Sequence, residues 1–337
     1  MERRGTVALL IVALLSLILV ACSVEPATPT PVPLEPVSLQ LQWVTQAQFA
    51  GYYVALDKGW YREEGIDLTI QPGAPDFIPV DLVTAGIHEF GTSLLADLAI
   101  AIQDGKPVVS VAQIQQENGL LLIARKASGI ERPTDFTGKR VGVWLGSWEA
   151  QFNALVAKEQ VAPDAFELVA QGFSMDPFIA GELDVASAMI YNEYDVVLNS
   201  GIGIDELNII DYADYGLDMP GDTLFTTTML AEENPDLVVR MLRASLRGWQ
   251  YAVDHPDEAV GIVLKYDESG LQTRPHQTWM MNQIARLVQG ENRRLGFTRE
   301  ADVRRTIDTL LRYQILTEPL DPGRVYTNEF WAQANAQ

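Results

Sequence analysis

Three short segments combine aromatic rings with hydrogen-bonding side chains, and each follows a predicted strand. They are Trp43, the run from Trp144 to Trp148 with Ser147 inside it, and Tyr191-Asn192-Glu193. Aromatic rings stack on flat ligands at an offset, which contributes ~0.5–1.5 kcal/mol beyond the burial of area. A carboxylate such as Glu193 accepts hydrogen bonds from ring N–H, amino or hydroxyl groups. These residue types suit the binding of a flat polar ring.

Each of these candidates also has a purely structural interpretation. Tyr52 and Tyr53 fall in the first turns of the helix after Trp43, where they could stack on a ligand or simply fill the core. Asn192 could cap the following helix, and Glu193 could be a solvated acid that the helix dipole favours. The residues alone leave both interpretations open.

Patterns for metal binding and covalent catalysis are missing from the sequence. His88, His255 and His276 are scattered, without the paired spacing of a metal site. Neither a Gly-x-Ser-x-Gly elbow nor a phosphate-binding loop occurs. The formal net charge of −21 disfavours nucleic acid and anionic lipid as partners. We therefore expect no metal, no cofactor and no nucleic acid.

The N-terminus carries the features of an export signal. Charged residues precede an apolar run from Val7 to Val20, which is shorter than the roughly 20 residues that span a membrane. Leu19-Val20-Ala21-Cys22 resembles a bacterial lipobox, and Cys22 is the only cysteine. We expect residues 1–21 to be a cleaved signal, Cys22 to carry lipid, and proline-rich residues 22–36 to form a tether. The protein would then be anchored outside the cytoplasmic membrane.

The remainder alternates strand-length apolar runs with helix-period stretches, which predicts an α/β fold. Its length allows two lobes. We expect lobe 1 to comprise residues 37–125 and 225–337 and lobe 2 residues 126–224, with crossing segments near 124–127 and 222–226. Ligands of open α/β sheets bind at the carboxyl ends of strands, so a cleft between the lobes is predicted. The predicted strands are 38–43, 67–71, 89–92, 107–113, 119–124, 138–143, 166–170, 185–190 and 223–229.

The segment from Gln48 to Leu68, which includes Gly51-Tyr52-Tyr53 and Gly59-Trp60-Tyr61, resembles substrate-binding proteins related to the thiamine-pyrimidine synthases. Similar blocks follow at 105–109, 133–142, 181–185 and 191–193. The resemblance implies a two-lobed periplasmic-binding-protein fold, type II-like, and strengthens Glu193 as a ligand contact. Members bind formyl-aminopyrimidine, riboflavin or small anions, and one branch contains enzymes with a cysteine-rich iron motif. Here Gly91 is followed by Thr92-Ser93-Leu94-Leu95-Ala96, without cysteine.

The resemblance therefore implies a monomeric binding protein that delivers a ligand to the permease of an ABC importer, and not an enzyme. Six aromatic residues near the predicted cleft favour riboflavin over the thiamine pyrimidine precursor. A sulfonate or nitrate ligand would require basic residues at the strand ends, where none is found. Two competing functions are a pyrimidine-synthase-like enzyme and a sensory or adhesive lipoprotein.

Overall fold

The computed structural model describes residues 33–74, 77–145, 149–290 and 294–336. The chain divides into Met1–Pro33 and a unit spanning Leu34–Gln337, which carries all the elements described below. The expected signal peptide, Cys22 and most of the tether lie outside the described residues. The same holds for Ser147 and Trp148.

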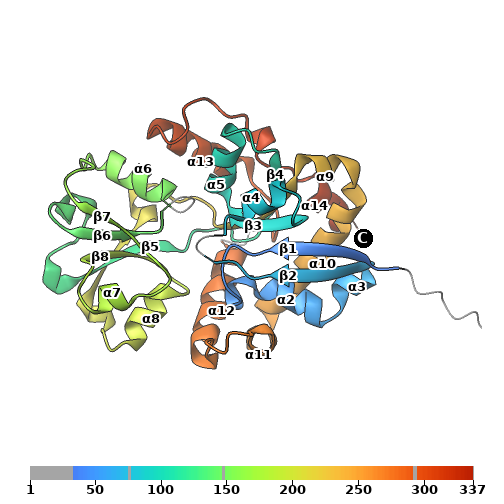
Figure 1. The fold of residues 1–337 in the computed structure, drawn as a ribbon, viewed down its shortest axis with the longest axis horizontal. Helices are drawn as coiled ribbons and strands as arrows, with labels where there is room; N and C mark the ends of the chain where they lie inside the picture. Colours follow the sequence, from blue (N-terminus) through green and yellow to red (C-terminus); the bar gives the residue numbers. More distant parts are fainter. Residues whose placement is uncertain (1–32, 75–76, 146–148, 291–293, 337) are drawn as a thin grey trace, which may run out of the picture. The chain divides into compact units, whose positions relative to one another are not determined.

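Two five-stranded sheets have matching topologies (Figure 1). In each, three strands run parallel, and one strand that is antiparallel to both its neighbours separates them from the fifth. This arrangement confirms the predicted α/β class. The first sheet has the order β2 (Ile66–Gln71), β1 (Glu35–Gln40), β3 (Phe90–Leu94), β10 (Asp222–Thr227), β4 (Val108–Gln113), and the second has the order β7 (Glu167–Ala170), β6 (Arg140–Val143), β8 (Val185–Met189), β5 (Leu120–Arg125), β9 (Leu207–Asp211).

The strands change sheet at different points from those expected. β5 falls within the residues 37–125 assigned to lobe 1, but it pairs with β8 and β9 of the second sheet. β10 begins before residue 225, yet it pairs with β3 and β4 of the first sheet. The connections between sheets are therefore 114–119 and 212–221, instead of 124–127 and 222–226. An apolar run predicts a buried strand, but only its backbone partners decide to which sheet it belongs.

Helix α2 (Ala50–Asp57) packs against the long helix α10 (Pro235–Asp254) because two glycines allow close approach. A Cβ atom on Gly51 would lie 2.2 Å from the ring of Trp249, and one on Gly248 would lie 2.1 Å from the Gly51 carbonyl oxygen. Asn234 caps α10 by accepting a hydrogen bond from the Leu237 amide. This pairing fixes α2, and with it the segment between β1 and α2.

Helix α12 (Arg274–Gln289) contacts elements that lead into both sheets. It packs against the short helix η1 (Ala47–Phe49), which follows β1, and against α8 (Glu193–Asn199), which follows β8. The remaining helices are α3 (Trp60–Glu63), α4 (Pro79–Thr84), α5 (Leu95–Gln103), α6 (Ala150–Lys158), α7 (Asp176–Ile179), α9 (Thr228–Glu233), α11 (Pro256–Tyr266), α13 (Glu300–Arg312) and α14 (Glu329–Ala334).

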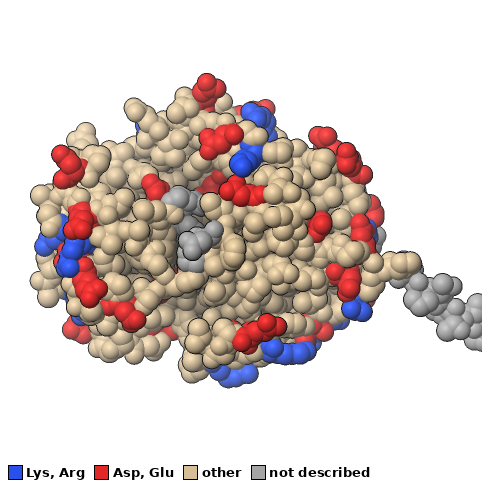
Figure 2. Space-filling view, in the orientation of Figure 1, with Lys and Arg blue, Asp and Glu red and all other residues tan. Residues whose placement is uncertain are grey.

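The surface agrees with the acidic composition. On the face shown in Figure 2, Asp and Glu side chains are scattered over uncharged surface, and Lys and Arg side chains form only small groups. Within the described ranges, no helix is both long enough and apolar enough to cross a membrane.

Candidate functional site

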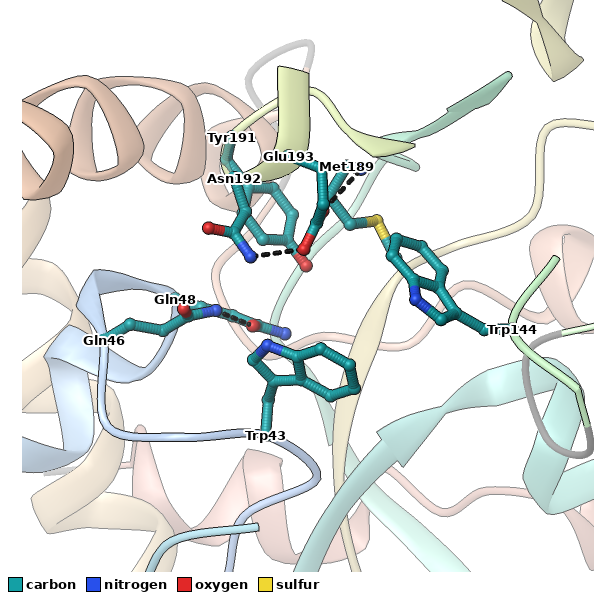
Figure 3. Close-up of a pocket in the computed structure, with 8 residues that line it drawn as sticks. All are labelled: Trp43, Gln46, Gln48, Trp144, Met189, Tyr191, Asn192 and Glu193. Carbon is teal, nitrogen blue, oxygen red and sulfur yellow. Dashed lines mark hydrogen bonds between the residues drawn. The ribbon is translucent and has the colours of Figure 1, made fainter. Parts of the chain in front are cut away.

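A cavity with an empty volume of about 220 Å³ lies where the loops after β1, β6 and β8 meet (Figure 3). Residues after β1 line one side, and residues from the end of β8 onward line the other. The carboxyl ends of parallel strands are the usual place for a ligand in such sheets. The lining residues are Trp43, Gln46, Gln48, Trp144, Met189, Tyr191, Asn192 and Glu193.

Two indole rings wall the cavity from opposite sheets. Trp43 follows β1 and Trp144 follows β6, and their ring centroids lie 6.1 Å apart at an interplanar angle of 69°. The Trp144 indole N–H donates to the Gly172 carbonyl oxygen over 3.1 Å, which fixes the orientation of that ring. Phe173 lies edge-on to Trp43 with centroids 4.2 Å apart. Flat apolar surfaces from both halves therefore face the same space.

On the side of the cavity formed by residues after β1, the buried carboxyl group of Asp222 fixes two glutamine side chains by hydrogen bonds. Asp222, at the start of β10, accepts hydrogen bonds from Nε2 of Gln42 over 2.7 Å and of Gln48 over 2.8 Å. Gln48 Oε1 in turn accepts from Gln46 Nε2 over 2.8 Å. The amides of Gln46 and Gln48 thus have fixed orientations at the cavity wall.

The opposite wall centres on Glu193, the first residue of α8. Its Oε2 accepts from the Met189 amide over 2.9 Å, and its Oε1 accepts from Asn192 Nδ2 over 2.5 Å. In Figure 3, Asn192 and Glu193 lie across the cavity from Gln46 and Gln48. The cavity therefore presents polar groups from both sheets at its ends and indoles at its side.

Burial changes the protonation of both acids. Removal from water raises the pKa of Glu193 from 4.5 to about 7, although the hydrogen bonds that its carboxylate accepts partly oppose this. Burial likewise raises the pKa of Asp222 from 3.8 to about 7, against the hydrogen bonds from Gln48 and Gln42. A carboxyl group with a pKa near 7 can present either an acceptor or a donor to a ligand.

The structure brings together five of the residues singled out in the sequence: Trp43, Trp144, Tyr191, Asn192 and Glu193 all line the cavity. Tyr52 and Tyr53 do not line it. The Tyr52 ring packs edge-on against Trp249, and the Tyr53 hydroxyl shares a hydrogen bond with Thr45. Both side chains are buried behind the site because α2 turns this face toward α10 and α11.

Several residues at the site were not predicted from sequence. Gln46 and Gln48 stand in a stretch with glutamine at 40, 42, 46 and 48, an unusual density of amides after a buried strand that could have indicated a polar wall. Met189 ends β8 two residues before Tyr191, and nothing in its type distinguishes it from a core residue. Phe173 gave no signal, since it lies in an irregular segment.

Within the part of the chain that the structure describes, no group of three or more His, Cys, Asp or Glu residues is arranged to hold a metal ion. The described lining residues also contain no nucleophile paired with a base. The arrangement is suited to stacking and hydrogen bonding.

Comparisons with known proteins agree with this architecture. Among relatives, the chain is 27% identical to the riboflavin-binding protein RibY of Chloroflexus aurantiacus, over 94% of this chain and 95% of the relative. It is 28% identical to the formylaminopyrimidine-binding protein of Halalkalibacterium halodurans, over 68% and 70%. It is also 28% identical to a 4-amino-5-hydroxymethyl-2-methylpyrimidine phosphate synthase of Legionella pneumophila, over 87% and 92%.

Solved structures share the fold at low sequence identity. The periplasmic nitrate-binding protein NrtA of Synechocystis PCC 6803 superposes with a TM-score of 0.69 at 12% identity, covering 89% of this chain and 88% of that one. The aliphatic sulphonate binding protein SsuA of Escherichia coli gives a TM-score of 0.63 at 14% identity, covering 86% and 91%. The two-lobed periplasmic-binding-protein fold expected from the sequence is thereby confirmed.

The family model described as NMT1/THI5 like matches residues 46–259, a stretch that includes seven of the eight residues lining the cavity. Because this match covers more than half of the chain, the protein belongs to the NMT1/THI5-like family.

Proposed function

We propose that this protein is an extracytoplasmic substrate-binding protein that captures a flat nitrogen heterocycle of the vitamin type and delivers it to an ABC permease. The observation that carries the proposal is the cavity itself, in which Trp43 and Trp144 from opposite sheets stand beside the carboxyl group of Glu193. Indoles bind ring faces, and the carboxyl and amide groups bind ring edges. The two relatives named as binding proteins support the same ligand class.

Within this class, the number of aromatic residues that line the cavity favours a single ring. The sequence-based preference for riboflavin depended on six aromatic residues, of which Tyr52 and Tyr53 pack in the core. A formyl-aminopyrimidine with amino donors facing Glu193 is therefore our first candidate.

Riboflavin is the second candidate. The relative named as a riboflavin-binding protein aligns with 94% of this chain, whereas the one named for formylaminopyrimidine aligns with 68%. Riboflavin would require a wider cavity, which opening of the two halves about the connections 114–119 and 212–221 would provide. Its ring edge also carries an N–H donor for Glu193.

Anion binding and synthesis are less well supported. None of the eight lining residues is basic, whereas a sulfonate or nitrate ion calls for Arg or Lys. Relatives named as pyrimidine phosphate synthases occur, but this chain has a single cysteine, at position 22. We infer binding without turnover, and tethering of the body to the outer side of the membrane through lipid on Cys22.

Titration with candidate ligands tests the proposal. Formyl-aminopyrimidine or riboflavin should quench tryptophan fluorescence, because both indoles would contact the ring, and mass spectrometry should recover the ligand unchanged. Taurine serves as the anionic control. A response to taurine alone would reject the heterocycle, and consumption of the ligand would identify an enzyme.

Phe173 should contribute modestly to retention of the ligand. Its ring covers the edge of Trp43 while remaining 42% exposed, so it lies at the rim of the site. We expect Phe173→Ala to weaken binding about 2- to 10-fold, corresponding to ~0.5–1.5 kcal/mol for one aromatic contact, mainly through faster dissociation. Stopped-flow fluorescence measures this rate. Leu168→Ala, at a similarly exposed residue of β7, is the matched control and should leave the rate unchanged.

A further inference from the structure

A row of hydrogen bonds runs from α12 into the cavity wall. His276 Nδ1 lies 2.7 Å from Asp195 Oδ2, and His276 Nε2 lies 2.9 Å from Asn192 Oδ1. Asn192 then donates from Nδ2 to Glu193 Oε1 over 2.5 Å. His276 does not line the cavity, but it contacts Asn192, which does, and reaches Glu193 through Asn192.

The directions of these hydrogen bonds are linked. Asp195 Oδ2 also accepts from Asn199 Nδ2 over 2.8 Å, so Asp195 serves as the acceptor for both neighbours and His276 Nδ1 is the donor to it. Because the Asn192 amide nitrogen points toward Glu193, the Asn192 oxygen Oδ1 faces His276. An amide oxygen can only accept, so His276 Nε2 donates to it. In this arrangement both ring nitrogens of His276 act as donors. With a single proton on Nδ1, the Asn192 amide would turn round, and its oxygen would face Glu193 Oε1.

Neighbouring residues of α12 keep His276 in place. Trp279 donates from its indole nitrogen to the Ile190 carbonyl oxygen over 3.0 Å. Ile190 lies between the lining residues Met189 and Tyr191. Gln277, fully buried, accepts from the Ala47 amide over 2.6 Å, between Gln46 and Gln48. The helix thus contacts the cavity walls of both sheets through two residues that lie two positions apart, next to His276, and these contacts hold His276 in place.

We propose that His276 is a positioning residue that determines specificity: by donating to Asn192 Oδ1 it fixes the Asn192 amide so that Glu193 meets the ligand as a carboxylate acceptor. The site then selects heterocycles that carry an N–H or amino donor on the edge facing Glu193. This inference rests on the proposed function for its ligand, but the state of His276 can be measured without one. The charged groups that the hydrogen bonds place around His276 are Asp195 directly and Glu193 through Asn192.

The ligand-free protein gives the first test. The chain has three histidines, so ¹⁵N NMR of labelled protein resolves their rings, and a His276→Gln variant assigns the signal of His276. We expect both ring nitrogens of His276 to act as hydrogen-bond donors in the folded protein. A neutral ring with a bare Nε2 would overturn the proposal.

Two variants then reverse and restore the donor directions in the hydrogen bonds that link Asp195, residue 276, Asn192 and Glu193. In His276→Gln, the side-chain amide of the glutamine donates to Asp195, so its carbonyl oxygen faces Asn192. The Asn192 amide then donates to that oxygen, and its own oxygen turns toward Glu193. The titration midpoint of Glu193, followed by ¹³C NMR, should rise on the order of one pH unit because its ionised form loses a donor. Adding Asp195→Asn restores the original donor directions without any charge, and the midpoint should return. Trp279→Phe, which loosens the same loop, should not move it.

Ligand probes complete the test. Riboflavin and its N3-methyl derivative differ by one donor, and formyl-aminopyrimidine carries an amino donor. In the wild-type protein the donor-bearing probes should bind at least 10-fold more tightly than the methylated one, and His276→Gln should abolish the difference while the double variant restores it. An unchanged preference in His276→Gln would refute the assigned role. If no probe binds the wild-type protein, the proposed function fails, and the NMR results still decide the role of His276.

Discussion

Replacing Trp43 with alanine should weaken binding of the ring ligand by about 1–3 kcal/mol, which corresponds to roughly 5- to 150-fold in Kd. The indole forms one wall of the cavity and is only 7% exposed, so a ligand that contacts it gains apolar burial as well as stacking. Isothermal titration calorimetry with formyl-aminopyrimidine and riboflavin measures the loss. Trp43→Phe keeps a ring and should recover most of the affinity.

A second alanine variant separates lost stacking from lost stability. Trp331 lies on α14 and packs edge-on against Phe297 with centroids 5.1 Å apart, away from the cavity. Trp331→Ala removes the same side chain and should leave Kd unchanged while lowering the melting temperature. Equal affinity of the Trp43→Ala and wild-type proteins, at comparable folded fractions, would reject the cavity as the binding site.

The ligand-free protein should become more stable as the pH falls from 8 to 5, by a few kcal/mol in the free energy of unfolding. Glu193 and Asp222 have folded-state pKa values raised to about 7, from 4.5 and 3.8 in the unfolded chain. The stability linked to each is fully present below the unfolded value and is lost as the pH rises through 7, with a slope of up to ~1.4 kcal/mol per pH unit per group. Urea unfolding at several pH values measures the slope.

Variants isolate these two groups from the general effect of the acidic surface, whose self-repulsion also declines at lower pH. Glu193→Gln and Asp222→Asn should each reduce the slope between pH 5 and 7 by about the contribution of one proton. Glu131→Gln, at an exposed residue, removes a negative charge without a buried acid and should leave the slope as in the wild type. A wild-type slope shared by all four proteins would show that neither buried acid is responsible.

Much of the fold followed from local patterns. Strand-length apolar runs separated by helix-period stretches identified nearly every strand, and Trp43, Trp144 and Glu193 were placed at strand ends where the cavity lies. β9 was not predicted, because Leu207–Asp211 alternates only briefly and its residues are half buried at a sheet edge. The sheet to which β5 belongs was also predicted wrongly, because its pairing with β8 and β9 is not encoded in its own residues.

Side-chain direction was harder to predict than element type. Tyr52, Tyr53 and Trp43 are all aromatic residues near one strand end, but the contacts between α2 and α10 direct the two tyrosines into the core. The roles of Asp222 and His276 depend on partners 174 and 84 residues away in sequence, Gln48 and Asn192. An isolated aspartate in an acidic protein, or one histidine among three, carries no sequence signal of such a role.

The position of β10 in the first sheet constrains how the chain can acquire its structure during synthesis. β10 lies between β3 and β4, although more than 100 residues separate it from β4 along the chain. Until residue 227 leaves the ribosome, β3 and β4 have no strand between them, and both expose backbone groups that invite pairing with other chains. A chain shorter than this leaves the edges of β3 and β4 unpaired, so the first half cannot be expected to fold as an isolated fragment.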